Sequence, residues 1–334
     1  MMSTSFSNIS TAEYLHSDWL LSNSGLSPTT LRTYMECPRK SYLQRFNVGR
    51  FPDNIHFAFG NAFGHAAAYI VEHYRPFCNK NALAGAAMMQ TLRFISEATN
   101  FKGKTFYNMA VIVSALVESW GNWYASGYRF HSAETKFKVQ AGGFAFNGMQ
   151  DVLLYNELTK SYCIVDFKAI GNGYYYNWAL DPQIMLYSFM SWLHTGGEYE
   201  EGHYMVAEFQ PDNLSLSRHS VKAGAYKMIP ALIETALQAK VVHETPPSQL
   251  SCIPISTPTC KKGTWYCDFV DICSGEARAF AQSQTDDRVV NAVAVIKLNS
   301  IDELRLRAAE FAERMSVSEP ESSQPQWDVL DMEL

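Results

Sequence analysis

The pattern of hydrophobic and polar positions changes along the chain, and its first third has helical spacing. Ser27 and Pro28 predict a helix start, because a serine N-cap followed by a first-turn proline is typical of one. That helix carries Cys37, and we expect Pro38 to interrupt or kink it. Further helices are predicted from about residue 59, over 82–99 and over 106–126.

The pattern then changes to the alternation that is typical of half-buried strands. Asp181 and Pro182 next supply an N-cap and a first-turn proline for a helix that runs to about residue 193. The order of helix, three strands, helix and strand indicates an α/β fold. The predicted strands cover 134–140, 144–155, 162–168, 203–209 and 214–221, and a further helix is predicted at 224–240.

Composition limits the class of protein. The chain has 334 residues, enough for one large domain or two smaller ones, and it is 47% hydrophobic and 18% charged, as in globular proteins. The first ten residues lack the basic and apolar regions of a signal peptide. Since no uninterrupted apolar run reaches about 18 residues, we expect no membrane span. We therefore expect a cytoplasmic protein, or one in a host cytoplasm if a virus encodes it.

One short segment is basic although the formal net charge is −6. Its five cations fall within twenty residues, against the single acid Glu36. Such a segment can bind phosphates, and the alternative is a solvated helix face. The cations are Arg32, Arg39, Lys40, Arg45 and Arg50.

An acid and a lysine stand two residues apart in the apolar stretch IVDFKAI. Asp166 and Lys168 point to the same face if this stretch is a strand. A hairpin between the neighbouring strands brings Asp151 beside Asp166. Two adjacent carboxylates repel each other unless a cation lies between them, and Mg²⁺ or Mn²⁺ suits oxygen ligands. The alternative is a buried ion pair of Asp166 and Lys168, with Asp151 in a turn.

The seven cysteines are unevenly distributed, because four of them lie in the 22 residues from Cys252 to Cys273. Without a secretion signal they argue against a disulfide framework. Cys78 and Cys163 are expected to be inert thiols.

Five segments in a fixed order resemble the PD-(D/E)xK nuclease superfamily, and within it the RecB-like exonucleases. These include the CRISPR-associated Fe–S exonucleases and the nuclease domains of bacterial recombination complexes. The resemblance covers about residues 26–275 and implies a restriction-endonuclease-like αβββαβ core, a mixed sheet flanked by helices. The segments are LSPTTLRTYMECPRKSYL (26–43), GNAFGHAAAYI (60–70), FNGMQDVLLY (146–155), IVDFKA (164–169) and DPQIMLYSFM (181–190).

The resemblance implies that His65, Asp151 and Asp166 hold Mg²⁺ or Mn²⁺. Glu134 is a further candidate ligand, through water, and Lys168 is expected to assist the attacking water rather than to neutralise the acid. Ordinary packing for His65 and an exposed edge position for Glu134 are the alternatives.

The same resemblance implies that Gln183 and Tyr187, one helical turn apart, contact DNA or organise the site. The alternative is helix packing. Tyr174-Tyr175-Tyr176 and Trp178 follow the Asp-x-Lys strand, where they either stack on unpaired bases or pack in a loop.

In the Fe–S nucleases that the chain resembles, one N-terminal cysteine and three near the C-terminus hold a [4Fe–4S] cluster. The matching residues here are Cys37, Cys260, Cys267 and Cys273. The spacing departs from the family's Cys-x2-Cys at Thr264, so Cys252 remains an alternative to Cys260. A zinc site and free thiols are the other two interpretations.

We therefore expect a metal-dependent DNA exonuclease of recombination, repair or processing, acting on DNA ends or single strands in the 5′→3′ direction. A non-catalytic DNA-binding scaffold and a structure-specific endonuclease are the alternatives. The acidic tail is expected to be disordered or to dock a replication or recombination partner. The expected division is an extension (1–25), a nuclease domain (26–275) with a helical insertion (80–127), a helical segment (276–315) and the tail (316–334).

Overall fold

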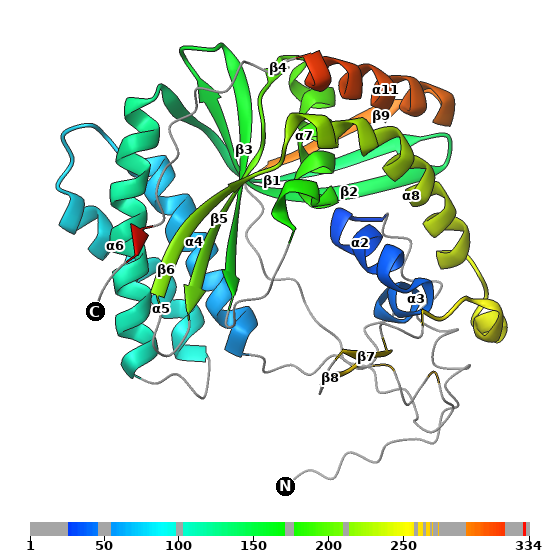
Figure 1. Ribbon diagram of the computed structural model, residues 1–334, viewed down its shortest axis with the longest axis horizontal. Helices are drawn as coiled ribbons and strands as arrows, with labels where there is room; N and C mark the ends of the chain where they lie inside the picture. Colours follow the sequence, from blue (N-terminus) through cyan, green and yellow to red (C-terminus); the bar gives the residue numbers. More distant parts are fainter. Residues whose placement is uncertain are drawn as a thin grey trace, which may run out of the picture. The chain divides into compact units, whose positions relative to one another are not determined.

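The structure is a computed structural model, and the chain forms two compact units (Figure 1). One consists of Met1–Pro52, Gly143–Asn147 and Ala231–Val289, and the other of Asp53–Gly142, Gly148–Pro230 and Val290–Leu334. The structure describes residues 26–45, 55–97, 103–170, 177–209, 214–256, 260–262, 265–267, 269, 273, 292–317 and 330–331. The predictions for residues 1–25, Arg50, Tyr174–Tyr176, Thr264 and most of the tail lie outside these ranges.

The larger unit is built on a mixed eight-stranded sheet with the order β10-β6-β5-β3-β2-β1-β9, and β4 lies beside β3. The pairs β2–β3 and β5–β6 are antiparallel, whereas β3–β5 and β1–β9 are parallel. The strands are β1 (Tyr128–Ala141), β2 (Phe144–Asn156), β3 (Ser161–Ile170), β4 (Glu198–Tyr199), β5 (His203–Phe209), β6 (Leu214–Ser220), β9 (Ala292–Leu298) and β10 (Leu330–Asp331).

Helices cover this sheet, as Figure 1 shows. Alternation along β3 sends Val165 and Phe167 into a core shared with α4 and α6, where Phe63 contacts Phe167 edge-on at 6.0 Å between ring centroids. Asp166 and Lys168 therefore point to the opposite face, which α7 contacts. The helices of this unit are α4 (Ile55–His73), α5 (Lys80–Glu97), α6 (Gly103–Ala125), α7 (Pro182–Thr195) and α11 (Ile301–Val317).

Helix α7 begins as its sequence predicts. The Asp181 side chain accepts a hydrogen bond of 2.7 Å from the backbone N–H of Gln183, with Pro182 in the first turn. The helix ends at Gly196, which adopts the left-handed φ of 65°. Because residues 182–192 are all buried, α7 has a fixed position against the sheet, and so does Gln183 at its start.

The smaller unit joins distant parts of the chain. Pro38 separates two helices at Cys37, which is extended, so the predicted interruption is confirmed. A small core of Tyr42, Leu43, Ile253 and Phe269 packs against Cys267 and Cys273. The elements are α2 (Pro28–Glu36), α3 (Pro38–Arg45), the part of α8 (Ile229–His243) from Ala231 on, the 3₁₀-helix η3 (Pro247–Cys252), β7 (Lys261–Lys262) and β8 (Trp265–Tyr266).

Three elements differ from expectation. The segment 276–315, expected to be helical, contains β9, which pairs in parallel with β1 before α11 begins. The helix expected at 224–240 starts as the 3₁₀-helix η2 (Ala223–Met228) and continues as α8. Within the tail, Leu330 pairs with Leu216 of β6. Both strand pairings join residues far apart in sequence, which local periodicity does not reveal.

None of the helices that the structure describes is both long and apolar enough to cross a membrane.

Gly148 of β2 lies directly against α7. A Cβ placed there would lie 2.4 Å from Met190 Cε and 2.9 Å from Tyr187 Cε1. We predict that Gly148→Ala lowers the free energy of unfolding by about 1–3 kcal/mol, because the Met190 methyl and the buried Tyr187 ring must move away from the added Cβ. Urea unfolding followed by circular dichroism measures this.

The matched control is Gly85→Ala in α5, where an added Cβ meets no atom within 4 Å. That variant is expected to be more stable by about 0.5–1 kcal/mol. Equal stability of Gly148→Ala and the wild type would contradict the close contact.

Candidate active site

The predicted pair of Asp166 and Lys168 is present on β3. Lys168 Nζ lies 2.5 Å from Asp166 Oδ2, and the Asp166 side chain is 1% exposed whereas that of Lys168 is 28% exposed. Lys168 therefore forms an ion pair with the acid, and its expected role toward the attacking water stays a prediction. The pair has a buried carboxylate and a cation that reaches solvent.

Asp151 ends the regular pairing of β2 with β3. The backbone ladder runs from Asn156–Ser161 to Val152–Val165. One position further, Asp151 Oδ2 accepts a hydrogen bond of 2.8 Å from the Phe167 N–H. A side chain thus replaces the backbone carbonyl as acceptor, and the described ladder stops beside Asp166. The expected meeting of Asp151 and Asp166 occurs where the two strands separate.

Helix α7 contributes two residues to the same site. Gln183 Nε2 donates hydrogen bonds to Asp166 Oδ1 at 3.1 Å and to the Tyr187 hydroxyl at 3.3 Å. Both side chains are nearly buried. Gln183 therefore orients the carboxylate, and Tyr187 orients Gln183, in agreement with an organising role.

The electrostatics of the pair follow from burial. Burial raises the pKa of Asp166 to about 7, Lys168 opposes this shift, and Asp151 and Asp181 add to it. Burial alone lowers the pKa of Lys168, but Asp166 and Asp151 more than compensate, so its pKa lies above the usual 10.5. Lys168 is therefore protonated at neutral pH, whereas Asp166, with a pKa of about 7, changes its protonation state close to neutral pH.

His65 and Glu134 form a second pair. His65 Nδ1 lies 3.1 Å from Glu134 Oε1, and the side chains are 27% and 20% exposed. Glu134 has the left-handed φ of 48°, an unfavourable conformation for a residue with a side chain, in the middle of β1. The strand is thus strained at the residue that contacts the histidine.

The model of the PD-(D/E)XK nuclease superfamily matches residues 25–274, about three quarters of the chain. The chain belongs to the PD-(D/E)XK nuclease superfamily. No curated protein matches it. The crystal structure of SSO0001 is similar over 79% of this chain and 96% of that chain, with 13% identity and a TM-score of 0.32, too low to carry an argument.

Members of the PD-(D/E)XK superfamily are phosphodiesterase nucleases that typically use Mg²⁺ or Mn²⁺, so the family indicates a metal-dependent nuclease with DNA as its substrate. The chain's donors suit such an ion: Asp151 and Asp166 supply carboxylates, and Asp166 Oδ2 is buried with no hydrogen bond besides its ion pair with Lys168. Among the described residues, however, no three His, Cys, Asp or Glu side chains form a metal-binding group. His65 and Glu134 stay a separate pair.

The cysteines expected to bind iron lie in the smaller unit. Burial raises the pKa of Cys273, Arg39 lowers it, and Cys267, Cys37 and Cys260 raise it, so the four thiols lie within electrostatic range of one another. Cys37 Sγ accepts a hydrogen bond of 3.5 Å from the Ser256 N–H. Cys252 is exposed. Thiols suit an Fe–S cluster, although the described residues do not close around a metal as they stand.

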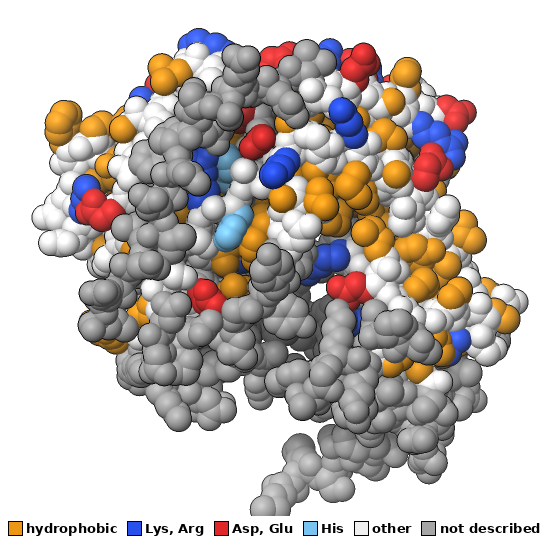
Figure 2. All heavy atoms as spheres, viewed as in Figure 1, with side chains coloured by type: hydrophobic (Ala, Val, Ile, Leu, Met, Phe, Trp, Pro, Cys, Tyr) orange, Lys and Arg blue, Asp and Glu red, His pale blue; other side chains and the backbone are white. Residues whose placement is uncertain are grey.

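Two described cations of the basic segment, Arg39 and Lys40, bind partners within the protein. Arg39 Nη2 donates to the backbone oxygens of Ile253 at 2.6 Å and Ser251 at 3.0 Å, and Lys40 pairs with Glu36 at 3.6 Å. Arg39 therefore stabilises the smaller unit. Figure 2 shows scattered Lys and Arg side chains on the described part of this face and no broad basic patch.

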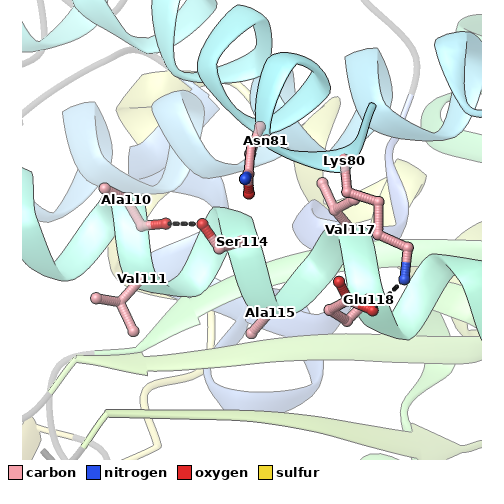
Figure 3. A pocket seen from close by; sticks show the side chains of 9 residues that line it. Lys80, Asn81, Ala110, Val111, Ser114, Ala115, Val117 and Glu118 are labelled. Atoms are coloured by element: carbon pink, nitrogen blue, oxygen red, sulfur yellow. Dashed lines mark hydrogen bonds and ion pairs between the residues drawn. The ribbon is translucent and has the colours of Figure 1, made fainter. Parts of the chain in front are cut away.

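A cavity of about 470 Å³ lies between α5 and α6 and is not part of the candidate site (Figure 3). Its charged lining residues, Lys80 and Glu118, pair with each other, and most of the rest are small and apolar. It therefore offers no unpaired charge to a phosphate.

Two residues of the site face were not predicted. Tyr204 of β5 pairs with Asp166, and His219 of β6 pairs with Tyr204, so both lie on the Asp166 face of the sheet. The strand order brings them there, and no short motif marks either residue.

The pKa of Asp166 predicts how stability depends on pH. In the folded protein this pKa is about 7, above the ordinary value of 3.8 for an aspartate, so the folded state binds the extra proton between these two values. Without divalent ions, the wild type should lose stability relative to Asp166→Asn as pH rises from about 4 to 7, and the difference should level off above 7. Urea unfolding in EDTA across this range measures it.

Asp302→Asn is the control, because the Asp302 side chain is 87% exposed. Its stability should follow that of the wild type across the range. If the free energy of unfolding of the wild type and of Asp166→Asn changed in parallel with pH, the pKa of Asp166 would not be raised in the folded state.

Proposed function

We propose that the protein is a Mg²⁺- or Mn²⁺-dependent DNA exonuclease that hydrolyses phosphodiester bonds at DNA ends or in single strands. The observation that carries the proposal is the arrangement around Asp166: its carboxylate is buried, paired with Lys168 and hydrogen-bonded to Gln183, where β2 and β3 separate. The superfamily match supplies the reaction class. By resemblance to the RecB-like Fe–S nucleases, 5′→3′ cleavage in cytoplasmic recombination, repair or processing is the favoured assignment.

In this proposal Asp151, Asp166 and His65 hold the ion. When bound, the ion supplies Lewis-acid stabilisation of charge on the phosphate and activates water. Glu134 Oε1 lies 3.1 Å from His65 Nδ1, so in this proposal it positions the ring and need not be a ligand itself. This differs from the water-mediated ligand role expected from the sequence.

Lys168 and Gln183 have distinct roles. Because its pKa is raised, Lys168 keeps its proton and stabilises negative charge on the phosphate oxygens instead of acting as a general base. Gln183 holds Asp166 Oδ1, which leaves Oδ2 facing Lys168. Water attacks phosphorus, the bond to the ester oxygen breaks, and that oxygen leaves with a proton.

Lys168→Met is expected to reduce cleavage of DNA in Mn²⁺ by about 10²–10³-fold, as loss of one preorganised charge does in other enzymes. Asp166→Asn is expected to abolish it. Release of acid-soluble nucleotides from linear DNA measures both effects.

Lys240→Met is the matched control: Lys240 is 32% exposed and pairs with Glu244 at 2.7 Å, much as Lys168 pairs with Asp166. It should retain wild-type activity. Undiminished cleavage by Lys168→Met or Asp166→Asn would refute the assigned site.

The second candidate is a DNA-binding scaffold with a nuclease fold, favoured by the lack of a closed metal group among the described residues. Linear and circular single-stranded DNA with Mn²⁺ separate the two candidates. Loss of linear DNA alone indicates an exonuclease, loss of both an endonuclease, and binding without cleavage a scaffold. Products from 5′- and 3′-labelled strands then give the polarity.

We also propose that Cys37, Cys260, Cys267 and Cys273 hold a [4Fe–4S] cluster with a structural role. Support comes from the electrostatic coupling of these thiols and from the resemblance to the Fe–S nucleases. Cys267 and Cys273 pack against the core of Tyr42 and Phe269, which joins the N-terminal helices to the later segment of the smaller unit. The exposure of Cys252 favours Cys260 as the third ligand.

Cys260→Ala is therefore expected to lose iron, absorbance near about 400 nm and thermal stability. Cys252→Ala, the control, should keep all three. Anaerobic purification, iron analysis and the visible spectrum decide. Absence of iron and of this absorbance in the wild-type protein would refute the cluster proposal. If Cys252→Ala lost the absorbance and Cys260→Ala kept it, Cys252 and not Cys260 would be the ligand.

A further inference from the structure

Three aromatic side chains extend from the candidate site across the sheet. Tyr204 lies opposite Asp166 on β5, and His219 lies opposite Tyr204 on β6. Neighbouring strands are about 4.8 Å apart, so Tyr204 is about 5 Å and His219 about 10 Å across the sheet from Asp166. Residues that face each other in a ladder point to the same side, which is also the side of Asp166.

Trp178 covers this row. It opens the 3₁₀-helix η1 (Trp178–Leu180), directly before the Asp181 cap of α7. Its ring is 4.7 Å from the Tyr204 ring at 47°, and it stacks on His219 at 5.7 Å and 27°. Trp178 is partly exposed, whereas Tyr204 is fully buried beneath it. Lys168 Nζ lies 5.8 Å from the Tyr204 ring, so the aromatic row begins at the catalytic lysine.

The row is suited to a flat uncharged group. Burial lowers the pKa of His219, so its ring is neutral at pH 7, and its Nε2 lies 2.9 Å from Ser217 Oγ. A neutral histidine whose Nε2 already has a partner is a poor phosphate ligand and a good stacking partner. Aromatic rings bind unpaired bases because every base has a π-face, whereas bases within a duplex are stacked on their neighbours.

We propose that Trp178, supported by Tyr204 and His219, is a stacking surface for an unpaired base next to the phosphate held at Asp166 and Lys168. Single-stranded DNA, or the unpaired end of a duplex, is then the preferred substrate. The inference rests on the proposed nuclease function and adds to it a residue that selects the substrate class. Trp178 contacts the base and takes no part in the bond cleavage.

Binding of short single-stranded DNA tests the stacking surface separately from cleavage. With Ca²⁺ in place of Mg²⁺ and a fluorescent 12-nucleotide strand, anisotropy gives Kd. Stacking of one base is worth about 5- to 150-fold in affinity, so Trp178→Ala should raise Kd at least about fivefold. Trp178→Phe should retain most of the affinity, and duplex DNA with blunt ends should bind equally to all variants.

Phe77→Ala is the matched control, because Phe77 is a fully exposed aromatic residue outside the site. It should leave Kd unchanged. A Kd for Trp178→Ala within twofold of the wild-type value would overturn the proposal. An equal loss of affinity for single-stranded and duplex DNA in this variant would overturn it as well.

A scan with abasic strands tests the same point in the unaltered protein, so it does not depend on the folding of a variant. The base at one position is removed at a time while its phosphate stays. Removal of the base at one position should raise the Kd of the wild type as much as Trp178→Ala does. Removal of the same base should not raise the Kd of Trp178→Ala any further. A uniform profile in the wild type would overturn the stacking surface.

Cleavage assays keep this inference apart from the proposed function. In Mn²⁺, Trp178→Ala should raise KM for single strands and leave kcat within about twofold of the wild-type value. If the wild type cleaves DNA and Trp178→Ala has wild-type KM, the stacking surface alone fails. If the wild type neither binds nor cleaves any DNA, the nuclease proposal fails and this inference fails with it.

Discussion

The burial of Asp166 is the constraint on which the site depends. An ionised carboxylate that is 1% exposed on a central strand loses its hydration, and it is tolerated only with compensating partners. Lys168 supplies charge and Gln183 supplies a hydrogen bond, but Asp151 adds a second negative group nearby, so the pKa still rises to about 7. The site thus carries more negative charge than its own cation balances, which is the condition that a bound divalent cation relieves.

Much of the surrounding structure serves to keep these partners in place. Gln183 can reach Asp166 because Asp181 caps α7 two residues earlier, and because α7 packs closely on β2 at Gly148. The strands separate at Asp151, whose side chain takes the hydrogen bond that a backbone carbonyl takes elsewhere in the ladder. The Asp151 side chain therefore satisfies the Phe167 N–H at the position where the described backbone pairing of β2 and β3 ends, beside the buried Asp166.

Local patterns predicted the parts of the structure that depend on neighbours in sequence. The cap of α7, the break at Pro38 and the shared face of Asp166 and Lys168 all follow from short-range geometry. Long-range pairing was not predictable in this way: β9 reaches β1 across more than 150 residues, and Arg39 binds the backbone of Ile253 instead of remaining available for DNA. The resemblance named His65 and Glu134, but only the fold shows that they pair with each other.

The His65–Glu134 pair also limits what the site can be. A left-handed residue inside a strand costs on the order of 1–3 kcal/mol, and at Glu134 that cost comes with a carboxylate 3.1 Å from His65 Nδ1. Strained backbone of this kind occurs often at functional sites. In the proposed nuclease, the raised pKa of Lys168 would keep this side chain protonated, so it would stabilise negative charge and another group would remove the proton from water.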